Sequence, residues 1–377
     1  MRILCWCDAF WPRVGGVEVL AARVVLGLRA RGHQVLVVSD RQVVLEAESS
    51  FQGIPVRRFP FLETAHVRDA DRWVALRQEV AALKRRFQPD VTWIYHPNID
   101  AAFHLATLAA CGSPTLVTAH GAYADGLTAE EHTIGRVLRT ADWVTACTAA
   151  ALDDTRTRVP EIVGRSSVVW TGLEMPPQAP RPLPDGPPRL LCAGRMRTVR
   201  EKGFDVAIHA LPAVLDRFPG ARLAIAGDGP ARPEIEAIAR DAGVRDHVDF
   251  LGWVRPDDLP DVMSDATLVL VPSRVAAGFG LAALQAAQMA RVVVAANVGG
   301  LREVVADGET GVLCEPGSAE ALAAATLDLL ADRDGLARMG VRARQRAALG
   351  FSLERHVDQY DELLRRLAWS VVPAGME

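Results

Sequence analysis

The sequence predicts an α/β protein built from two doubly wound domains, each with a parallel sheet covered by helices on both faces. Three observations predict this class. The chain has 377 residues, a length that suits two domains of common size. Short apolar runs alternate with amphipathic helical stretches, the pattern of repeated strand–helix units. A proline-rich segment at 176–188 interrupts this alternation near the middle of the chain.

The first domain is expected over residues 1–175. Arg2–Cys7 is an apolar strand, Gly15 and Gly16 then open a helix, and Gln34–Ser39 forms the next strand. Further strands are expected at Ile54–Phe59, Val91–Tyr95, Thr115–Ala119, Trp143–Ala146 and Ser167–Trp170.

The prolines of 176–188 remove backbone donors and fix φ, so this segment is expected to be a linker and hinge. The second domain should span 189–352, and 353–377 should hold a final amphipathic helix. The expected strands are Arg189–Ala193, Arg222–Ala226, His247–Leu251, Thr267–Val271, Arg291–Ala295 and Gly311–Cys314. The expected helices include Phe204–Arg217, Pro233–Ala242, Phe279–Met289 and Ala319–Leu330.

Composition excludes several classes. Hydrophobic residues make up 50% of the chain and charged residues 23%, which is not the composition of a disordered protein. A formal charge of −4 gives no general attraction to nucleic acid or to an anionic membrane. The six cysteines lack metal-ligand spacing, so we expect burial in a reducing cytoplasm. Asp8 comes too early for a signal peptide, and no apolar run is long enough to span a bilayer.

Several loops that follow predicted strands suit an anion, because glycines admit a close approach and a helix N-terminus presents free N–H groups. One such loop contains Gly15 and Gly16. Another such loop follows the strand that ends at Ala193 and carries Arg195 and Lys202. Lys202 is one of only two lysines in the chain. Others are 278–281 and 299–300. Plain turn glycines and solvated surface cations are the alternatives for each loop taken alone.

Three further features have competing interpretations. His120 ends a strand and precedes glycine, which favours a position at the ligand-binding edge over a structural role. The segment 72–87 pairs an apolar stripe with basic residues, and a helix packed on the sheet is favoured over a membrane-surface helix. The Glu130–His132 cluster lacks zinc-helix spacing and is expected to be solvated.

The order of motifs resembles the retaining family-4 nucleotide-sugar glycosyltransferases of the GT-B fold. The motifs are GGVE at 15–18, GRMRTVREKGFD at 194–205, AGDGP at 226–230, FLGWV at 250–254, PSRVAAGFGLAALQAAQMA at 272–290 and GGLREVVADGETGVLCEP at 299–316. The resemblance implies two Rossmann-like domains facing across a cleft, with the last helix crossing back to the first domain. It also implies metal-independent transfer of a hexose-type sugar, with no cofactor besides the nucleoside-diphosphate sugar donor.

The resemblance also assigns roles to residues. Arg195 and Lys202 would hold the donor diphosphate, and Val254 would lie near the base. His120 would lie beside the transferred sugar and the acceptor. The remaining donor-binding residues would be Gly15, Gly16, Gly278, Phe279, Gly280, Leu281 and Gln285.

One departure from the family leaves alternatives open. The family's two glutamates, eight residues apart, correspond here to Ala277 and Gln285. Gln285 keeps hydrogen-bonding capacity, whereas Ala277 has none. A non-catalytic nucleotide-sugar-binding protein and a sugar-nucleotide epimerase are therefore the alternatives. The acceptor is expected to be a small molecule, glycan or lipid-linked molecule, and its loops to lie at Glu46–Gln52 and Ala122–Glu131.

Overall fold

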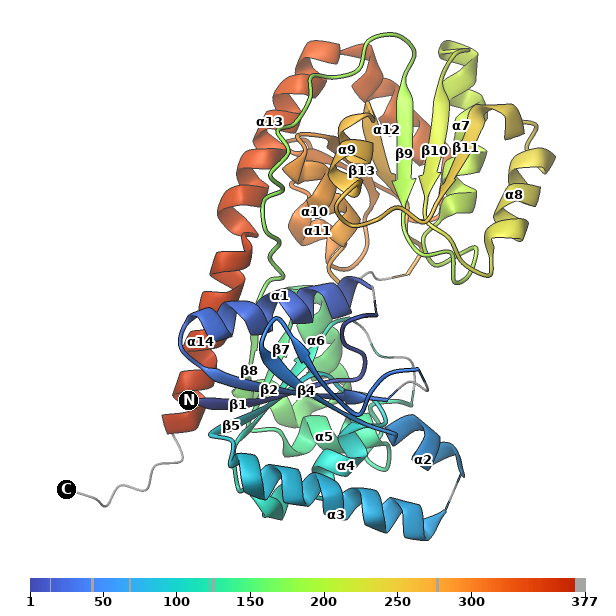
Figure 1. The fold of residues 1–377 in the computed structure, drawn as a ribbon. Helices are drawn as coiled ribbons and strands as arrows, with labels where there is room; N and C mark the ends of the chain where they lie inside the picture. Colours follow the sequence, from blue (N-terminus) through green and yellow to red (C-terminus); the bar gives the residue numbers. More distant parts are fainter. Residues whose placement is uncertain are drawn as a thin grey trace. The chain divides into compact units, whose positions relative to one another are not determined.

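The chain divides into two compact units in the computed structural model (Figure 1). The structure describes residues 1–13, 15–41, 44–67, 69–121, 123, 126–275 and 278–369. Unit 1 comprises Met1–Thr171 and the C-terminal residues from Leu353 onward, and unit 2 comprises Gly172–Ser352. No helix of the described part is both long enough and apolar enough to cross a membrane.

Unit 1 is built on an eight-stranded sheet. Seven strands pair in parallel, and the edge strand β3 pairs antiparallel with β4. The expected loop at Glu46–Gln52 thus contains β3, which forms a hairpin with β4 through a turn at Gln52 and Gly53. In spatial order the strands are β3 (Glu48–Phe51), β4 (Ile54–Phe59), β2 (Gln34–Asp40), β1 (Arg2–Cys7), β5 (Val91–His96), β6 (Thr115–Ala119), β7 (Trp143–Ala146) and β8 (Ser166–Val168).

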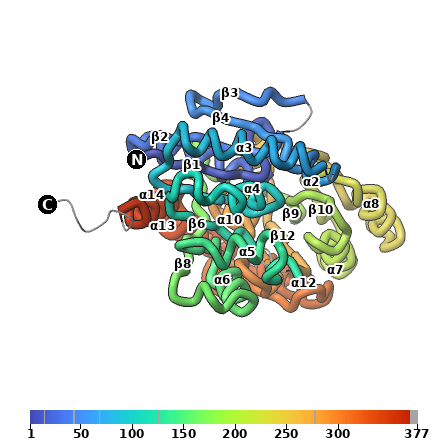
Figure 2. The backbone as a smooth tube through the Cα atoms, turned by 90° about the horizontal axis from the view of Figure 1, so that it is seen from below, coloured from blue at the N-terminus to red at the C-terminus, as the bar shows by residue number. Residues whose placement is uncertain are grey.

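Helices cover both faces of this sheet. Figure 1 shows α1 over one face and α3 over the other, and Figure 2 shows α3 and α4 from below. Trp6 of β1 marks the face covered by α3, since its ring stacks on Phe61 and lies under the ammonium of Lys84, and the alternate side chains of the strand point to the other face. The helices are α1 (Gly16–Ala30), α2 (Phe61–Val67), α3 (Ala70–Phe87), α4 (Ala101–Leu105), α5 (Thr133–Thr140), α6 (Ala149–Arg158) and α14 (Leu353–Trp369), with 3-10 turns at Leu108–Ala110 and Pro160–Arg165.

The segment 72–87 is a helix packed on the sheet, as its apolar stripe favours. Leu76, Val80 and Leu83 of α3 are buried. Lys84 is also buried, so it does not belong to the exposed basic face of this helix. Its ammonium contacts His104 Nδ1 at 3.2 Å and the backbone oxygens of His104 and Thr107 at 3.3 and 3.4 Å.

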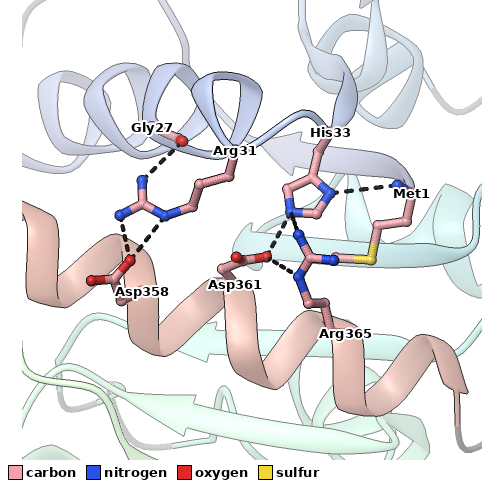
Figure 3. Close-up of polar contacts among 7 residues, drawn as sticks. All are labelled: Met1, Gly27, Arg31, His33, Asp358, Asp361 and Arg365. Carbon is pink, nitrogen blue, oxygen red and sulfur yellow. Dashed lines mark hydrogen bonds and ion pairs between the residues drawn. The ribbon is translucent and has the colours of Figure 1, made fainter.

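The C-terminal helix α14 belongs to unit 1 although more than 180 residues of unit 2 precede it. Tyr360 contacts the hydroxyls of Thr118 and Thr145 and packs on the Trp93 ring at 4.4 Å. At the end of α1, His33 Nε2 lies 2.6 Å from Asp361, which also accepts from Arg365 (Figure 3). The chain therefore returns to unit 1 and closes its core.

A glycine sets the spacing between α1 and α14. A Cβ at Gly27 would lie 2.8 and 2.9 Å from the two methyl carbons of Val357, which is buried. Arg31, one turn later, donates to the Gly27 carbonyl and to Asp358 of α14 (Figure 3). The two helices can be this close only because position 27 lacks a side chain.

Unit 2 contains a six-stranded, fully parallel sheet. Its strands in spatial order are β11 (Val248–Gly252), β10 (Arg222–Ala226), β9 (Arg189–Ala193), β12 (Leu268–Val271), β13 (Val292–Ala296) and β14 (Gly311–Cys314). The helices are α7 (Phe204–Arg217), α8 (Arg232–Asp241), α9 (Leu259–Ser264), α10 (Leu281–Gln288), α11 (Leu301–Val304), α12 (Ala319–Ala331) and α13 (Arg333–Gly350), with a 3-10 turn at Arg245–His247.

The proline-rich segment expected as a linker lies within unit 2. The buried Arg291 donates to the carbonyls of Arg181 and Pro182 at 2.8 and 3.1 Å. Arg333 donates to the carbonyls of Leu183 and Pro184, both at 2.9 Å. Arginine side chains thus satisfy the backbone carbonyls of a segment that cannot join a sheet.

The Gly27 contact leads to a stability prediction. Gly27→Ala should lower the free energy of unfolding by about 1–3 kcal/mol, because the new methyl group overlaps the stiff Val357 side chain. The measurement is chemical denaturation followed by tryptophan fluorescence. Gly350→Ala is the control, since a Cβ at this helical position meets nothing within 4 Å. The double variant that carries both Gly27→Ala and Val357→Ala should be more stable, by about 1 kcal/mol or more, than the two single losses added together predict. Simple additivity would exclude the contact as the cause.

Candidate functional site

Three loops meet at the carboxyl edge of the unit 2 sheet. They follow β9, β10 and β11, which are neighbours in the sheet. Gly194 N donates to Ala226 O at 2.9 Å, and Gly227 N donates to Gly252 O at 2.8 Å. Met196 N donates to Asp228 O, also at 2.9 Å. Ligands of open parallel sheets bind at this edge, so these loops form the floor of a candidate site.

Glycines permit this close approach. Gly227 has φ +142°, and a Cβ there would lie 1.9 Å from Gly194 O. A Cβ at Gly229, with φ +153°, would lie 2.4 Å from Met196 O. Gly203 has φ +69° and would place a Cβ 1.9 Å from Pro272 O. Any other residue at these positions would force the backbones apart.

Arg195 and Lys202 lie in the loop between β9 and α7 of this edge. The methylenes of Lys202 pack over Gly194, where a Cβ would lie 3.2 Å from Lys202 Cγ. Lys202 Nζ lies 3.7 Å from Glu201, and its side chain keeps 34% of its exposure. Arg195 is exposed and makes no hydrogen bond or ion pair with another described residue. Both cations are therefore available to an anion.

The loop before α10 differs from the predicted helix over Phe279–Met289. The helix begins at Leu281 and ends at Gln288, because Gly280 has φ +92° and cannot continue it backwards. Phe279 is buried and packs edge-to-face on Phe351, with ring centroids 5.5 Å apart.

Gly280 is the N-cap residue of α10, and no side chain accepts a hydrogen bond from the first N–H groups of the helix, which begin at Leu281. The first turn also carries no acidic residue. An anion can therefore approach this N-terminus. Gln285 is half-buried on the same helix, and Gly278 is half-buried before it. Ala277 lies outside the described residues.

An ion pair between an exposed arginine and a buried carboxylate in this region was not anticipated from the sequence. Arg274, after β12, donates to Asp205 Oδ2 of the first turn of α7 at 2.6 Å. Asp205 is 7% exposed, and its Oδ1 has no partner. The pair ties the loop after β12 to α7, next to the Gly203–Pro272 contact. An acidic residue in a first helical turn is too common a signal to reveal it.

The loop after β11 carries Val254, which is half-buried, and Trp253, which is 59% exposed. Gly252 before them has φ +69° and accepts the hydrogen bond from Gly227. This bond joins the Val254 loop to the loops after β10 and β9. Val254 therefore belongs to the same edge of unit 2 as Lys202.

In unit 1, Gly15 and Gly16 begin helix α1, but a carboxylate already lies there. A Cβ at Gly15 would lie 2.2 Å from Glu18 Oε2. Glu18 is 8% exposed and faces Arg13 at 3.6 Å. The negative charge at this helix N-terminus reduces its attraction for a further anion.

His120 follows β6 at the carboxyl edge of the unit 1 sheet. Its ring packs on Tyr95 at 4.5 Å and lies 5.8 Å from the His96 ring. Its Nε2 is buried without a partner, and burial, together with His96 and His356, lowers the pKa of His120 to about 3. The imidazole is therefore neutral at physiological pH, and its buried Nε2 can donate a hydrogen bond to a ligand hydroxyl or accept one from it. Among the described residues, no group of three or more His, Cys, Asp or Glu side chains could hold a metal ion.

The fold of the chain matches known solved structures. Sucrose-phosphate synthase of Thermosynechococcus elongatus superposes with a TM-score of 0.82 over 98% of this chain and 99% of that one, at 21% identity. Two doubly wound units with a C-terminal helix that returns to the first define the GT-B class of glycosyltransferase folds.

Sequence comparisons identify the family. The model "Glycosyltransferase Family 4" matches residues 14–175, and "Glycosyl transferases group 1" matches 187–332. Glycogen synthase of Mycobacterium tuberculosis is 31% identical over 93% of this chain and 91% of its own length. The chain belongs to glycosyltransferase family 4.

A second Mycobacterium tuberculosis relative matches a shorter stretch. It is the GDP-mannose-dependent alpha-(1-6)-phosphatidylinositol monomannoside mannosyltransferase, 35% identical over 164 residues. That match covers 42% of this chain and 42% of the relative, so less than half of the relative's length is spanned.

The glycine contacts of unit 2 can be tested by a matched pair of substitutions. Gly227→Ala should destabilise unit 2 by about 1–3 kcal/mol more than Gly243→Ala, and it should weaken nucleotide binding. Both positions have positive φ, but a Cβ at Gly243, with φ +70°, meets nothing within 4 Å. The φ of +142° at Gly227 is more strained for alanine than the left-handed φ of Gly243, so the difference in denaturation midpoint measures the clash with Gly194 together with this added strain. Equal effects would mean that the loops can separate without cost.

The histidines of unit 1 make its stability depend on pH. Burial lowers the pKa of five of them below the ordinary value of 6.5: His33, His96, His104, His120 and His356. Below about pH 6.5 the unfolded chain therefore binds protons that the folded chain does not, and stability is lost as pH falls. Asp100 acts in the opposite sense, because burial raises the pKa of its carboxyl from 3.8 to about 8.

The net effect remains a loss. We expect the free energy of unfolding of unit 1 to fall by at least about 2 kcal/mol between pH 6.5 and 5, since each histidine contributes up to about 1.4 kcal/mol per pH unit. Trp6 and Trp93, both fully buried in unit 1, provide the fluorescence signal. His356→Gln removes one of these groups, so the unfolding free energy should change less steeply with pH, by up to about 1.4 kcal/mol per pH unit. Constant stability over this range would show that the histidines accept protons in the folded state.

Proposed function

We propose that the chain transfers a hexose-type sugar from a nucleoside diphosphate to an acceptor hydroxyl, with retention of configuration and without a metal. The observation that carries the proposal is the pair of cations Arg195 and Lys202 on a carboxyl edge where only glycine fits between the loops. Family membership supports a transferase, and the name of the mannosyltransferase relative states its dependence on a sugar nucleotide.

Each part of unit 2 has a role in this proposal. Arg195 forks two oxygens of the diphosphate, whereas Lys202 acts as a point charge held in place by its packing on Gly194. The uncapped N-terminus of α10 at Gly280 and Leu281 adds backbone donors. Fixed positive groups stabilise the charge that grows on the departing diphosphate, which is the work that a metal ion performs in other transferases.

The chemical step exchanges one bond for another at the anomeric carbon. The bond to the diphosphate oxygen breaks, and the bond to the acceptor oxygen forms on the same face. The acceptor proton passes to the departing diphosphate oxygen, so no external base is needed. His120 is neutral and positions the acceptor hydroxyl rather than removing its proton.

A non-catalytic role stays the second candidate because Ala277 and Gln285 stand where the family has glutamates, and Ala277 has no hydrogen-bonding side chain. Gln285 is half-buried on α10, where the family has a glutamate, and its amide can hold ribose hydroxyls without a charge. Binding of a nucleotide sugar without acceptor-dependent release of nucleoside diphosphate would favour this candidate. An epimerase would convert the donor with no acceptor present.

The decisive experiment starts with a thermal-shift screen of nucleoside diphosphates and their sugars. The donor that stabilises the chain most is then incubated with acceptor mixtures, and release of nucleoside diphosphate is followed. The anomeric configuration of the product, read by NMR coupling constants, tests retention. Activity that persists in a chelating buffer tests metal independence.

Lys202→Ala should reduce kcat/KM at least tenfold, a loss of more than about 1.4 kcal/mol of transition-state stabilisation, because the diphosphate loses its point charge. The affinity for nucleoside diphosphate, measured by calorimetry, should fall as well. Arg240→Ala is the control, since it removes an exposed cation of helix α8 in the same unit. Unchanged kinetics in Lys202→Ala would remove this residue from the site.

A further inference from the structure

Three carboxyl groups gather at the carboxyl edge of the unit 1 sheet. Asp40 ends β2, Asp8 follows β1, and Asp100 lies in the loop after β5; we call them the acidic edge. The strands β2, β1 and β5 are direct neighbours, so their ends lie only about 5 Å apart. Asn98 links two of the carboxyls, donating from Nδ2 to Asp8 at 3.0 Å and from its backbone to Asp100 Oδ1 at 3.2 Å.

Unpartnered polar atoms indicate that this edge holds a ligand. Asp100 is fully buried, yet its Oδ2 has no hydrogen-bond partner. His96 Nδ1, at the end of β5, and the buried hydroxyl of Tyr123, after the adjacent strand β6, are also without partners. Leaving such groups desolvated and unpaired costs free energy, and a bound polar molecule would recover it.

The charges around the acidic edge favour a cation. The charges that act most strongly on Asp100 are those of Asp8 and Asp40, and burial together with Asp8 raises the pKa of Asp100 to about 8. Burial also raises the pKa of Asp40, and Asp8 adds to this effect. A positive group bound among these carboxyls would relieve their repulsion.

The cations of unit 1 nearest to this edge in sequence are engaged elsewhere or exposed. Arg13 faces Glu18 at 3.6 Å. Arg58 donates to Ser49 and to the carbonyls of Trp11 and Glu46. Arg41 is exposed at the end of β2. Among the residues named here, the three carboxyls outnumber the one exposed cation, Arg41, whereas the edge of unit 2 carries the two cations Arg195 and Lys202.

We propose that the acidic edge binds the acceptor through a protonated amine, so that the acceptor class is a polyhydroxylated molecule bearing an ammonium group. The ammonium lies between Asp8 and Asp100 and lowers the pKa of the Asp100 carboxyl, which then gives up its proton, while His96 and His120 meet hydroxyls. A phosphate on this part of the acceptor would be repelled. The inference rests on the proposed function, since it takes unit 1 as the acceptor side.

Binding of three matched sugars to the full-length chain tests the proposal. D-glucosamine, D-glucose and D-glucose 6-phosphate share a ring and differ in charge, and NMR titration at pH 7 in the presence of saturating nucleoside diphosphate gives their affinities. We expect glucosamine to bind at least tenfold more tightly than glucose, with glucose 6-phosphate weakest. An equal or reversed order would overturn the proposal.

Variants separate the carboxyls from general charge effects. Asp8→Asn and Asp100→Asn should each reduce the preference for glucosamine at least fivefold. The amide at position 8 removes a charge, and the amide at position 100 prevents the carboxylate that forms there when the ammonium binds. Glu79→Gln, on the exposed face of α3, removes the same charge elsewhere in unit 1 and should leave the preference unchanged. Asp8 is only half-buried, so its variant tests the proposal even where Asp100→Asn fails to fold. A preference that survives Asp8→Asn would overturn the assignment.

The two proposals fail in different ways. Sugar transfer to neutral acceptors, without any preference for amines, would overturn the assignment of the acidic edge and leave the transferase proposal intact. A glucosamine preference that depends on Asp8, with no transfer from any nucleotide sugar, would support the edge as a binding site and overturn the proposed function.

Discussion

The close approach of backbones at the carboxyl edge of unit 2 is the constraint on which the donor side depends. Gly227 and Gly229 bring the loop after β10 into contact with the backbone of 194–196, and Gly203 brings α7 against Pro272. These contacts fix the loop that carries Arg195 and Lys202 from both sides. Lys202 is held by its packing on Gly194 and by a 3.7 Å ion pair with Glu201, and its side chain stays 34% exposed, while Arg195 is exposed, so both can reach a ligand.

The two units present opposite electrostatic edges built by the same topology. In each unit, loops at the carboxyl ends of parallel strands converge. In unit 2 they present free cations and an uncapped helix N-terminus. In unit 1 they present carboxyls and neutral histidines, and the N-terminus of α1 is already faced by Glu18. A diphosphate is therefore favoured on unit 2, and a neutral or cationic molecule on unit 1.

Much of the fold could be predicted from the sequence, because parallel strands buried on both faces appear as apolar runs. The positions of β1, β9 and β10 agree with their apolar runs, and the glycine motifs mark the loops of the unit 2 edge. Contacts between distant residues could not be predicted. Arg274 meets Asp205 across 69 residues, and Arg291 holds the proline-rich segment from 110 residues away.

The local sequence also predicted the wrong start for helix α10, because one backbone dihedral angle decides where that helix begins. The apolar pattern of 279–289 is helical throughout, yet the φ of +92° at Gly280 delays the helix until Leu281 and leaves Phe279 to pack on Phe351. Strand β3 in unit 1 was not predicted, because Glu48–Phe51 is polar and pairs only as an edge strand. Tertiary pairing, not local preference, forms that strand.

The two lysines show how far composition alone can carry a functional argument. Both lysines stand in an arginine-rich chain, but of the two only Lys202 lies at the carboxyl edge of a sheet, where the donor is proposed to bind. Lys84 is buried, and its three N–H donors match three acceptors on His104 and Thr107. A guanidinium, with five donors in a rigid fork, would leave some of them unpaired in that space. Burial and these hydrogen bonds account for Lys84 without a ligand, so rarity is no evidence of function. The case for Lys202 depends on its packing over Gly194 and its accessible ammonium.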